Sequence, residues 1–183
     1  MYKRIIPIIL LAGISLYVNA QKGLFETKKS LVSFVSDAPL ELIKASSKEL
    51  RGFLDPEKRT FAFIIPSKSF EGFNSPLQQV HFSENYIEAS KYPEASFKGK
   101  IIEQVDLSTD GEYQVRAKGA LNIHGVEQER IIRVKIKLNK GVLNASSDFS
   151  ILLREHNITI PKVVYQKIAE EIFIQVQMEM VKR

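Results

Sequence analysis

Cysteine is absent from the 183-residue sequence. This absence excludes disulfide bonds, thiolate metal sites, a cysteine nucleophile and a lipid-modified cysteine. A domain of this length without disulfides must be held together by its own hydrophobic core. The composition permits such a core, because 44% of the residues are hydrophobic and 26% are charged, as in ordinary globular proteins. One domain is the default expectation.

Motifs of catalysis are also missing. The chain has no G-x-S-x-G nucleophile elbow and no glycine-rich phosphate loop. Its three histidines, His81, His124 and His156, lack the spacing of a metal site on a helix or hairpin. Their convergence on a zinc ion is the less favoured alternative to separate structural roles, and for His124, in a turn, we expect a local hydrogen bond. We predict no catalytic residues, no metal site and no cofactor.

A basic block with interleaved aromatic residues, which is typical of nucleic-acid-binding proteins, does not occur either. Lysine and arginine instead alternate with apolar residues, as they do on the solvated face of a sheet. No nucleic-acid partner is therefore expected, although the net charge is +5.

No apolar run is long enough to cross a bilayer comfortably, since a transmembrane helix needs about 20 apolar residues. The first twenty residues have the pattern of a secretory signal peptide. Lys3 and Arg4 form its positive region, Ile5 to Tyr17 its mostly apolar region, and residues 18–20 (VNA) offer a cleavage site. We expect cleavage there, a mature domain at 21–183, and a periplasmic or secreted protein without stable membrane insertion. A retained anchor is the alternative.

Alternation of apolar and polar residues dominates the rest of the chain and predicts strands. The predicted strands are 28–36, 40–46, 59–65, the segment that holds Phe97, Gly99 and Ile101, 112–122, 130–138, 142–146, 149–154 and 171–180. Several short antiparallel strands favour a barrel or a sandwich, and the lack of alternation with long helices disfavours a parallel α/β sheet.

A helix is predicted to interrupt these strands. Ser75 has the position of an N-cap, Pro76 of the first helical residue, and Gln78 of the third, where it can complete a capping box. The helix is expected to run to about Ala89 and to be stopped by the sequence at 91–93 (KYP). It would cover one end of the sheet, as a lid or as a plug.

Two stretches resemble the signature of the YceI-like family of secreted lipocalin-like barrels. One runs from His81 to Gly99, with Tyr92-Pro93 and Phe97, and the other is residues 119–126 (GALNIHGV), which fits the pattern G-x-L-x-I-x-G-V. The resemblance extends from about Ser30 to Val181. It implies a mainly β fold, an antiparallel lipocalin-like barrel of about eight strands with one or two short helices, and an apolar tunnel that holds a polyisoprenoid or similar lipid chain.

The inward apolar side chains would line such a tunnel, with plain core packing as the alternative for any single residue. Small inward residues, Gly99, Ala117, Gly119 and Ala145, would leave space on neighbouring strands. Tyr113 or Arg154 could bind a head group, and a surface salt bridge is the alternative for Arg154. The predicted ligand-binding residues are Phe61, Phe63, Phe82, Tyr86, Phe97, Tyr113, Val115, Ile132, Val134, Ile136, Arg154, Ile174, Val176 and Met178.

The sequence is compatible with three functions. The favoured one is an exported, non-enzymatic protein that holds a polyisoprenoid or fatty chain for transport or storage. The second is an interaction or stress-response module of the cell envelope with the same fold and a filled core. The third, a hydrolase or isomerase, is the least favoured. An edge strand near the N-terminal segment could pair with a second copy to form a homodimer.

Overall fold

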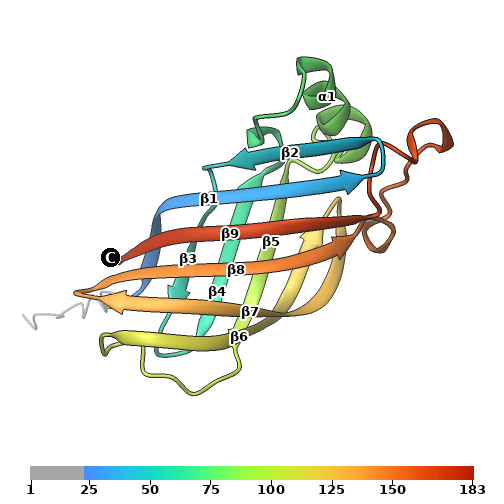
Figure 1. The fold of residues 1–183 in the computed structure, drawn as a ribbon. Helices are drawn as coiled ribbons and strands as arrows, with labels where there is room; N and C mark the ends of the chain where they lie inside the picture. The colour runs from blue at the N-terminus through green and yellow to red at the C-terminus, as the bar shows by residue number, and fades with distance from the viewer. Residues whose placement is uncertain (1–22) are drawn as a thin grey trace, which may run out of the picture.

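The structure, a computed structural model, describes residues 23–183. The predicted signal peptide therefore lies outside the described residues. The described chain forms one antiparallel sheet of nine strands (Figure 1). The strands are β1 (Phe25–Ala38), β2 (Glu41–Ser47), β3 (Arg51–Asp55), β4 (Thr60–Pro66), β5 (Glu94–Ile101), β6 (Gly111–Ile123), β7 (Val126–Asn139), β8 (Val142–Leu152) and β9 (Glu171–Lys182).

The sheet closes on itself through β1. One edge of β1 pairs with β3 near Phe25 and with β2 from Val32 onward, and its other edge pairs with β9. Eight strands, β1 and β3 to β9, form the closed barrel, and β2 is an extra strand beside β1. The prediction of an antiparallel barrel of about eight strands is confirmed.

The alternation in the sequence matches the two faces of the wall. In β9, Ile172 and Met180 are buried whereas Gln175 and Gln177 are exposed. β6 shows the same period, with Val115 facing inward between exposed neighbours. Because strand side chains point alternately to opposite faces, the apolar set of each strand gathers inside the barrel.

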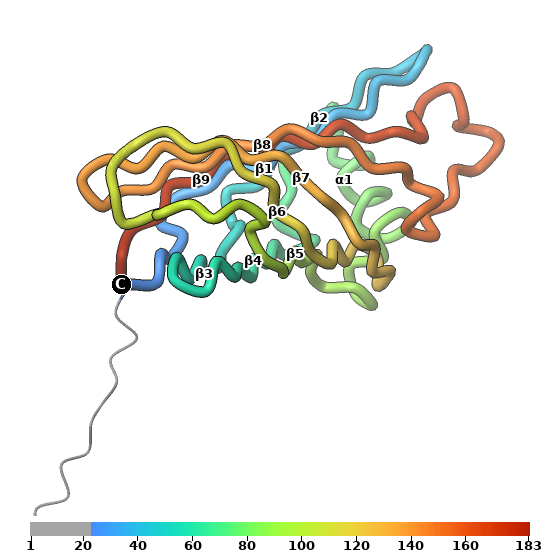
Figure 2. Tube along the Cα trace, turned by 90° about the horizontal axis from the view of Figure 1, so that it is seen from below, coloured from blue at the N-terminus to red at the C-terminus, as the bar shows by residue number. Residues whose placement is uncertain are grey.

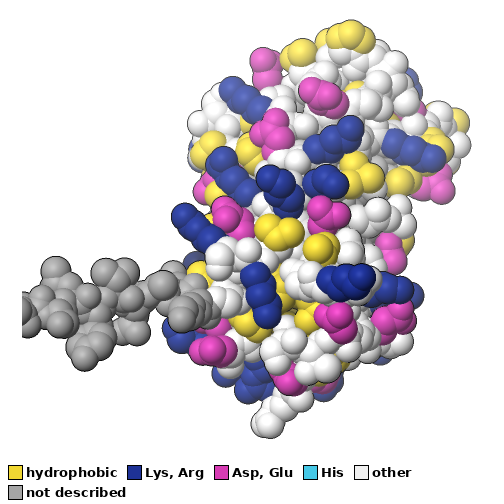
Figure 3. Space-filling view, turned by 90° about the vertical axis from the view of Figure 1, so that its left-hand side faces the viewer, with side chains coloured by type: hydrophobic (Ala, Val, Ile, Leu, Met, Phe, Trp, Pro, Cys, Tyr) yellow, Lys and Arg dark blue, Asp and Glu magenta, His cyan; other side chains and the backbone are white. Residues whose placement is uncertain are grey.

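One end of the barrel is filled. The loop between β5 and β6 folds back so that Leu107, which is 1% exposed, joins the buried cluster that contains Phe25, Leu138 and Leu143. In the same loop the Asp106 carboxylate accepts hydrogen bonds from the amide and hydroxyl of Ser108, which lower the pKa of that carboxyl. Figure 3 views this end, where basic and acidic side chains are interspersed. We call it the closed end.

The opposite end carries the helical segments (Figure 1). α1 (Pro76–His81) continues into a π-helical turn, Phe82–Tyr86, so the α-helix is shorter than predicted. The Ser75 Oγ accepts a hydrogen bond from the Gln78 amide at 3.2 Å, which confirms the predicted N-cap. The Gln78 side chain accepts from the amide of Asn74, one residue before the N-cap, so the predicted capping box is displaced by one position.

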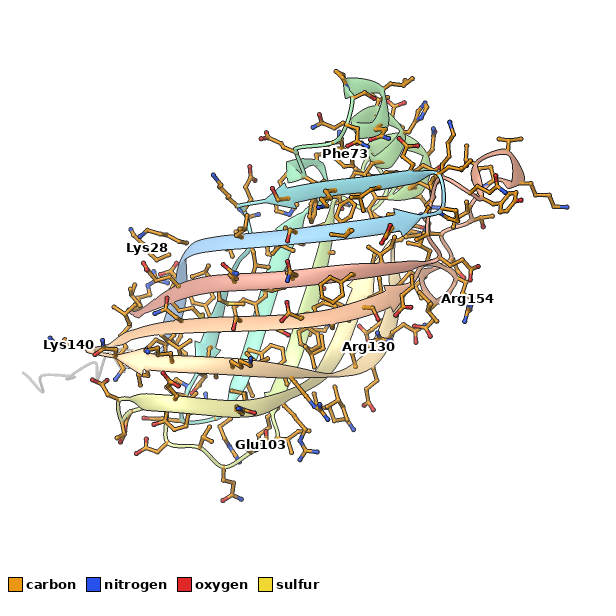
Figure 4. The ribbon with its side chains drawn as sticks, viewed as in Figure 1. Lys28, Phe73, Glu103, Arg130, Lys140 and Arg154 are labelled. Carbon is orange, nitrogen blue, oxygen red and sulfur yellow. The ribbon has the colours of Figure 1, made fainter. Side chains whose placement is uncertain are left out.

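β7 and β8 pair over only part of their length. Their ladder runs from Lys135 and Ser146 to the hairpin turn, so the first half of β7 has no backbone partner on β8. Side chains bridge this gap. Arg130, labelled in Figure 4, donates hydrogen bonds to the Ser150 carbonyl and to the Glu155 carboxylate. Between β7 and β8, the half of the wall nearest the helical end is therefore bridged by side chains rather than by a ladder.

Two of the small inward residues do not face open space. Gly99 of β5 and Gly119 of β6 lie opposite each other, and a Cβ on either would lie 2.1–2.2 Å from a backbone oxygen of the other strand. The interpretation of these glycines as cavity space is wrong, because they permit the close approach of two strands instead. The alanines of the set, Ala117 and Ala145, do line the interior cavity.

Candidate ligand-binding site

A cavity of about 610 Å³ occupies the barrel between the closed end and the helical end. Side chains from all nine strands line it, and nearly all of them are apolar. Its volume lies in the range of small-molecule sites, roughly 300–1,000 Å³. Phe25, Leu107 and Leu138 pack beyond its floor and do not line it. The cavity therefore has a closed floor and, at the helical end, a mouth.

The structure brings most of the predicted ligand-binding residues together in the wall of this cavity. Those that line it are Phe61, Phe63, Phe82, Tyr86, Phe97, Val115, Ile132, Val134, Ile136, Ile174, Val176 and Met178. Their role in binding stays a prediction. Tyr113 and Arg154 do not line the cavity.

Tyr113 lies at the closed end. Its hydroxyl is 3.0 Å from the carbonyl oxygen of Asp106 and 2.6 Å from that of Thr109, both in the β5–β6 loop. Arg154 lies on the outside of the connection between β8 and β9 (Figure 4), where it forms an ion pair of 2.7 Å with Glu170. Both side chains of that pair are 62% exposed, so the contribution of the pair to stability is small.

An aromatic cluster forms the wall of the cavity below the helical segments. Phe82 packs against Phe34, Phe70 and Phe73, with ring centroids 5.2–5.8 Å apart. Such offset and edge contacts add to the stabilisation that burial provides. Of these four residues, only Phe82 is among the ligand-binding residues predicted from the sequence. Phe70 and Phe73 precede the N-cap Ser75 closely, and this proximity is the signal that would have found them.

Polar side chains are concentrated at the mouth. Glu41, Gln78, His81 and Lys167 lie there, and Gln78 donates a hydrogen bond to the Glu41 carboxylate. In the π-helical turn, burial raises the pKa of Tyr86. The Tyr86 hydroxyl therefore stays protonated at neutral pH and can act as a hydrogen-bond donor inside the cavity. The charged side chains that line the cavity, Glu41 and Lys167, both lie at this end, where they could meet the polar end of a ligand.

His124 ties the helical end to the barrel. Its Nε2 is 2.6 Å from the carboxylate of Glu88, which follows the π-helical turn, and its Nδ1 is 3.0 Å from the His156 carbonyl oxygen. The Tyr92 ring packs on the His124 ring at 4.5 Å. The prediction of a local hydrogen bond for His124 is wrong, because the turn brings the imidazole to partners from two distant segments. Within residues 23–183, no group of acidic and histidine side chains is placed to hold a metal ion.

Because His156 is buried, we expect the free energy of unfolding to depend on pH. The side chain is fully buried, and burial lowers its pKa, although the carbonyl oxygens of Val126 and Ile123 act in the opposite direction. The unfolded chain therefore takes up a proton at a higher pH than the folded protein. We expect the free energy of unfolding to fall as the pH drops below about 6.5, by at most about 1.4 kcal/mol per pH unit, and this loss to end below the folded pKa.

Urea unfolding across this pH range measures the effect. In a His156→Gln variant the amide can still donate a hydrogen bond to Val126, but the titrating group is gone. We expect a flatter dependence of unfolding free energy on pH in the variant. Equal slopes for the variant and the original protein would contradict this assignment.

With the barrel and its cavity described, comparison with known proteins identifies the family. A model of the YceI-like domain matches residues 25–180, so the chain belongs to the YceI-like family. A comparison with curated protein sequences found no match.

Solved structures with the same fold come from several bacteria. A polyisoprenoid-binding domain from Saccharophagus degradans is 13% identical, with a TM-score of 0.73 over 88% of this chain and 99% of that one. BcnA of Burkholderia cenocepacia is 19% identical, with a TM-score of 0.67 over 82% and 95%. The YceI protein of Campylobacter jejuni is 16% identical, with a TM-score of 0.60 over 76% and 84%. At these identities the likeness concerns the fold.

The two family motifs in the sequence meet in space. Tyr92, from the KYP sequence, packs against His124 and Gly125, from the GALNIHGV stretch. Gly125 has a φ of +72°, and a Cβ there would lie 2.3 Å from the Tyr92 ring. Glycine is required at this position on both grounds. The two motifs thus hold the helical end against the β6–β7 turn.

Proposed function

We propose that this protein binds one polyisoprenoid or fatty chain in the barrel cavity and holds it for transport or storage, without chemical change. The observation that carries the proposal is the cavity itself, which is about 610 Å³ in volume and walled by apolar side chains from every strand. Membership of the YceI-like family and the fold shared with a polyisoprenoid-binding domain support the same class of ligand.

The hydrophobic effect would supply most of the affinity. Each methylene group removed from water contributes about 0.8 kcal/mol. The cavity offers few polar partners along its length, so recognition of the chain would depend on its length and shape. Glu41, His81 and Lys167 at the mouth are the candidates for contact with a polar head group.

A series of ligands that differ only in chain length tests this function. We expect the affinity of saturated fatty acids to rise about fourfold per added methylene, and that of linear isoprenoid alcohols to rise with each added isoprene unit, until the cavity is full, and then to level off. Displacement of a fluorescent lipid from the purified protein measures it. An affinity that did not depend on chain length would contradict the proposal.

The alternative is an interaction module of the cell envelope that acts through its surface. It is less well supported, because its premise is a filled core and the barrel holds a cavity instead. Among the described residues, the only feature that would suit catalysis is the cavity, which could hold a substrate as well as a stored chain. Turnover of a bound ligand would be the observation in its favour.

Export and self-association stay predictions. Export rests on the pattern of residues 1–20, and periplasmic location would suit a carrier of apolar chains between membranes. Among residues 23–183 the structure contains no helix with the length and apolarity needed to span a membrane. A second copy could pair along the outer edge of β2, whose ladder pairing beyond β1 is, within residues 23–183, a single bridge between Ser46 and Glu71.

A further inference from the structure

Exposed apolar side chains gather around the mouth of the cavity. The four most exposed large hydrophobic residues among those described are Val163 (90%), Leu40 (65%), Tyr165 (64%) and Leu77 (62%). They come from the β8–β9 connection, the β1–β2 turn and α1. We call these four residues the apolar rim. Isolated exposed hydrophobic residues are ordinary, but their concentration at one end indicates an interaction surface.

Direct contacts join the three segments that carry the rim. The Leu40 amide donates a hydrogen bond of 2.9 Å to the Gln166 carbonyl, which links the β1–β2 turn to the β8–β9 connection. The Gln78 side chain donates to Glu41, which links α1 to the same turn. Figure 2 shows the β1–β2 hairpin and the β8–β9 connection extending together at this end of the molecule. The three segments that carry the rim are therefore held together at the mouth.

Residues 158–168 (ITIPKVVYQKI) contribute to both the cavity and the rim. Ile158, Val164 and Ile168 line the cavity, while Val163 and Tyr165 point to solvent. Lys162 and Lys167 flank the exposed pair, and the segment contains no acidic residue. Apolar and tyrosine side chains between lysines are the combination found at membrane surfaces, where rings sit among head groups and lysines meet anionic lipids.

We propose that the apolar rim docks the mouth of the barrel on the surface of a bilayer that contains anionic lipid. Leu40, Leu77, Val163 and Tyr165 enter the head-group region, and Lys162 and Lys167 lie against anionic head groups. The docked mouth opens toward the acyl chains, so an apolar chain passes between bilayer and cavity without crossing water. The bilayer is thus the partner surface of the proposed function. The transfer of a chain rests on that function, whereas docking itself does not. Ligand-free protein would dock as well.

Sedimentation with lipid vesicles tests docking directly. The probes are vesicles of phosphatidylcholine alone and of phosphatidylcholine mixed with phosphatidylglycerol. The protein is ligand-free and contains all of residues 23–183. We expect binding to the mixed vesicles and weaker binding to phosphatidylcholine alone. The Val163→Ser/Tyr165→Ser variant should bind the mixed vesicles about tenfold more weakly or worse, because both side chains lose apolar contact with the interface. Lys162→Gln should weaken this binding about fivefold and leave binding to phosphatidylcholine unchanged.

A matched control lies on the barrel flank. Ile131 faces outward on β7 and is 56% exposed, so Ile131→Ser makes the same kind of change away from the mouth. This variant should bind vesicles as the original protein does. Docking is overturned if the rim variant binds as tightly as the original protein, or if Ile131→Ser loses as much as the rim variant.

Ligand binding in solution separates this inference from the proposed function. Val163 and Tyr165 do not line the cavity, so the rim variant should keep its affinity for soluble short-chain ligands. Loss of vesicle binding with unchanged ligand affinity supports docking. Failure of the original protein to bind any chain, with vesicle binding intact, would overturn the proposed function and leave the docking surface in place.

Discussion

Gly119→Ala is expected to destabilise the protein by about 3 kcal/mol or more. A Cβ at this position would lie 2.2 Å from the Lys98 carbonyl oxygen and 2.9 Å from the Cα of Gly99, both on the neighbouring strand. Backbone atoms in a ladder cannot move aside as a flexible side chain does, so β5 and β6 would have to separate. Since the total stability of a domain is roughly 5–15 kcal/mol, the loss is a large part of it.

The midpoint of urea unfolding, followed by circular dichroism, measures this change. Gly111→Ala is the matched control, because Gly111 begins the same strand and a Cβ there would lie 3.4 Å from the Tyr113 ring, an ordinary contact. The control should change the stability by less than about 1 kcal/mol. If both variants unfold at the same urea concentration, the close approach of β5 and β6 does not require glycine.

Ala145→Phe is expected to remove the binding of long chains and to spare short ones. Ala145 is 8% exposed, lines the cavity in its deeper half, and lies opposite Ile136 and Met178 on the adjoining strands. A phenyl ring there would occupy the space of several chain carbons. The loss of three buried methylenes already weakens binding by about 2.4 kcal/mol, or about sixtyfold.

Displacement assays with a long and a short isoprenoid alcohol measure this selectivity. Asn144→Phe is the control, since Asn144 is the next residue on the same strand and is exposed on the outer face. It adds the same ring outside the barrel and should leave both affinities unchanged. If Ala145→Phe binds the long chain as tightly as the original protein does, the chain does not reach this part of the cavity.

The wall of the barrel could be predicted from the sequence because each strand carries its own signal. The alternation in β9 and β6 identified the inward residues, and the serine–proline start identified the N-cap of α1. These signals are local. The closure of the barrel by pairing of β1 with β9 brings together the two ends of the described chain, and alternation within either strand cannot specify its partner.

Other features depended on three-dimensional placement. Tyr113 has the same inward alternation as Val115, but the folded-back β5–β6 loop captures its hydroxyl at the closed end. The alternation predicts open space at Gly99 and Gly119, and only the register of β5 with β6 shows that the two glycines lie opposite each other. His124 was assigned a local role because its partners, Glu88 and the His156 carbonyl, are distant in sequence.

Native mass spectrometry of the protein purified from its own cells tests most directly whether the cavity holds an apolar chain. We predict a complex heavier than the bare protein by the mass of one lipid, which is released on collisional activation. The same preparation of Ala145→Phe should carry a shorter chain or none. A bare chain in the original protein, together with no uptake of isoprenoid or fatty ligands in vitro, would contradict the account.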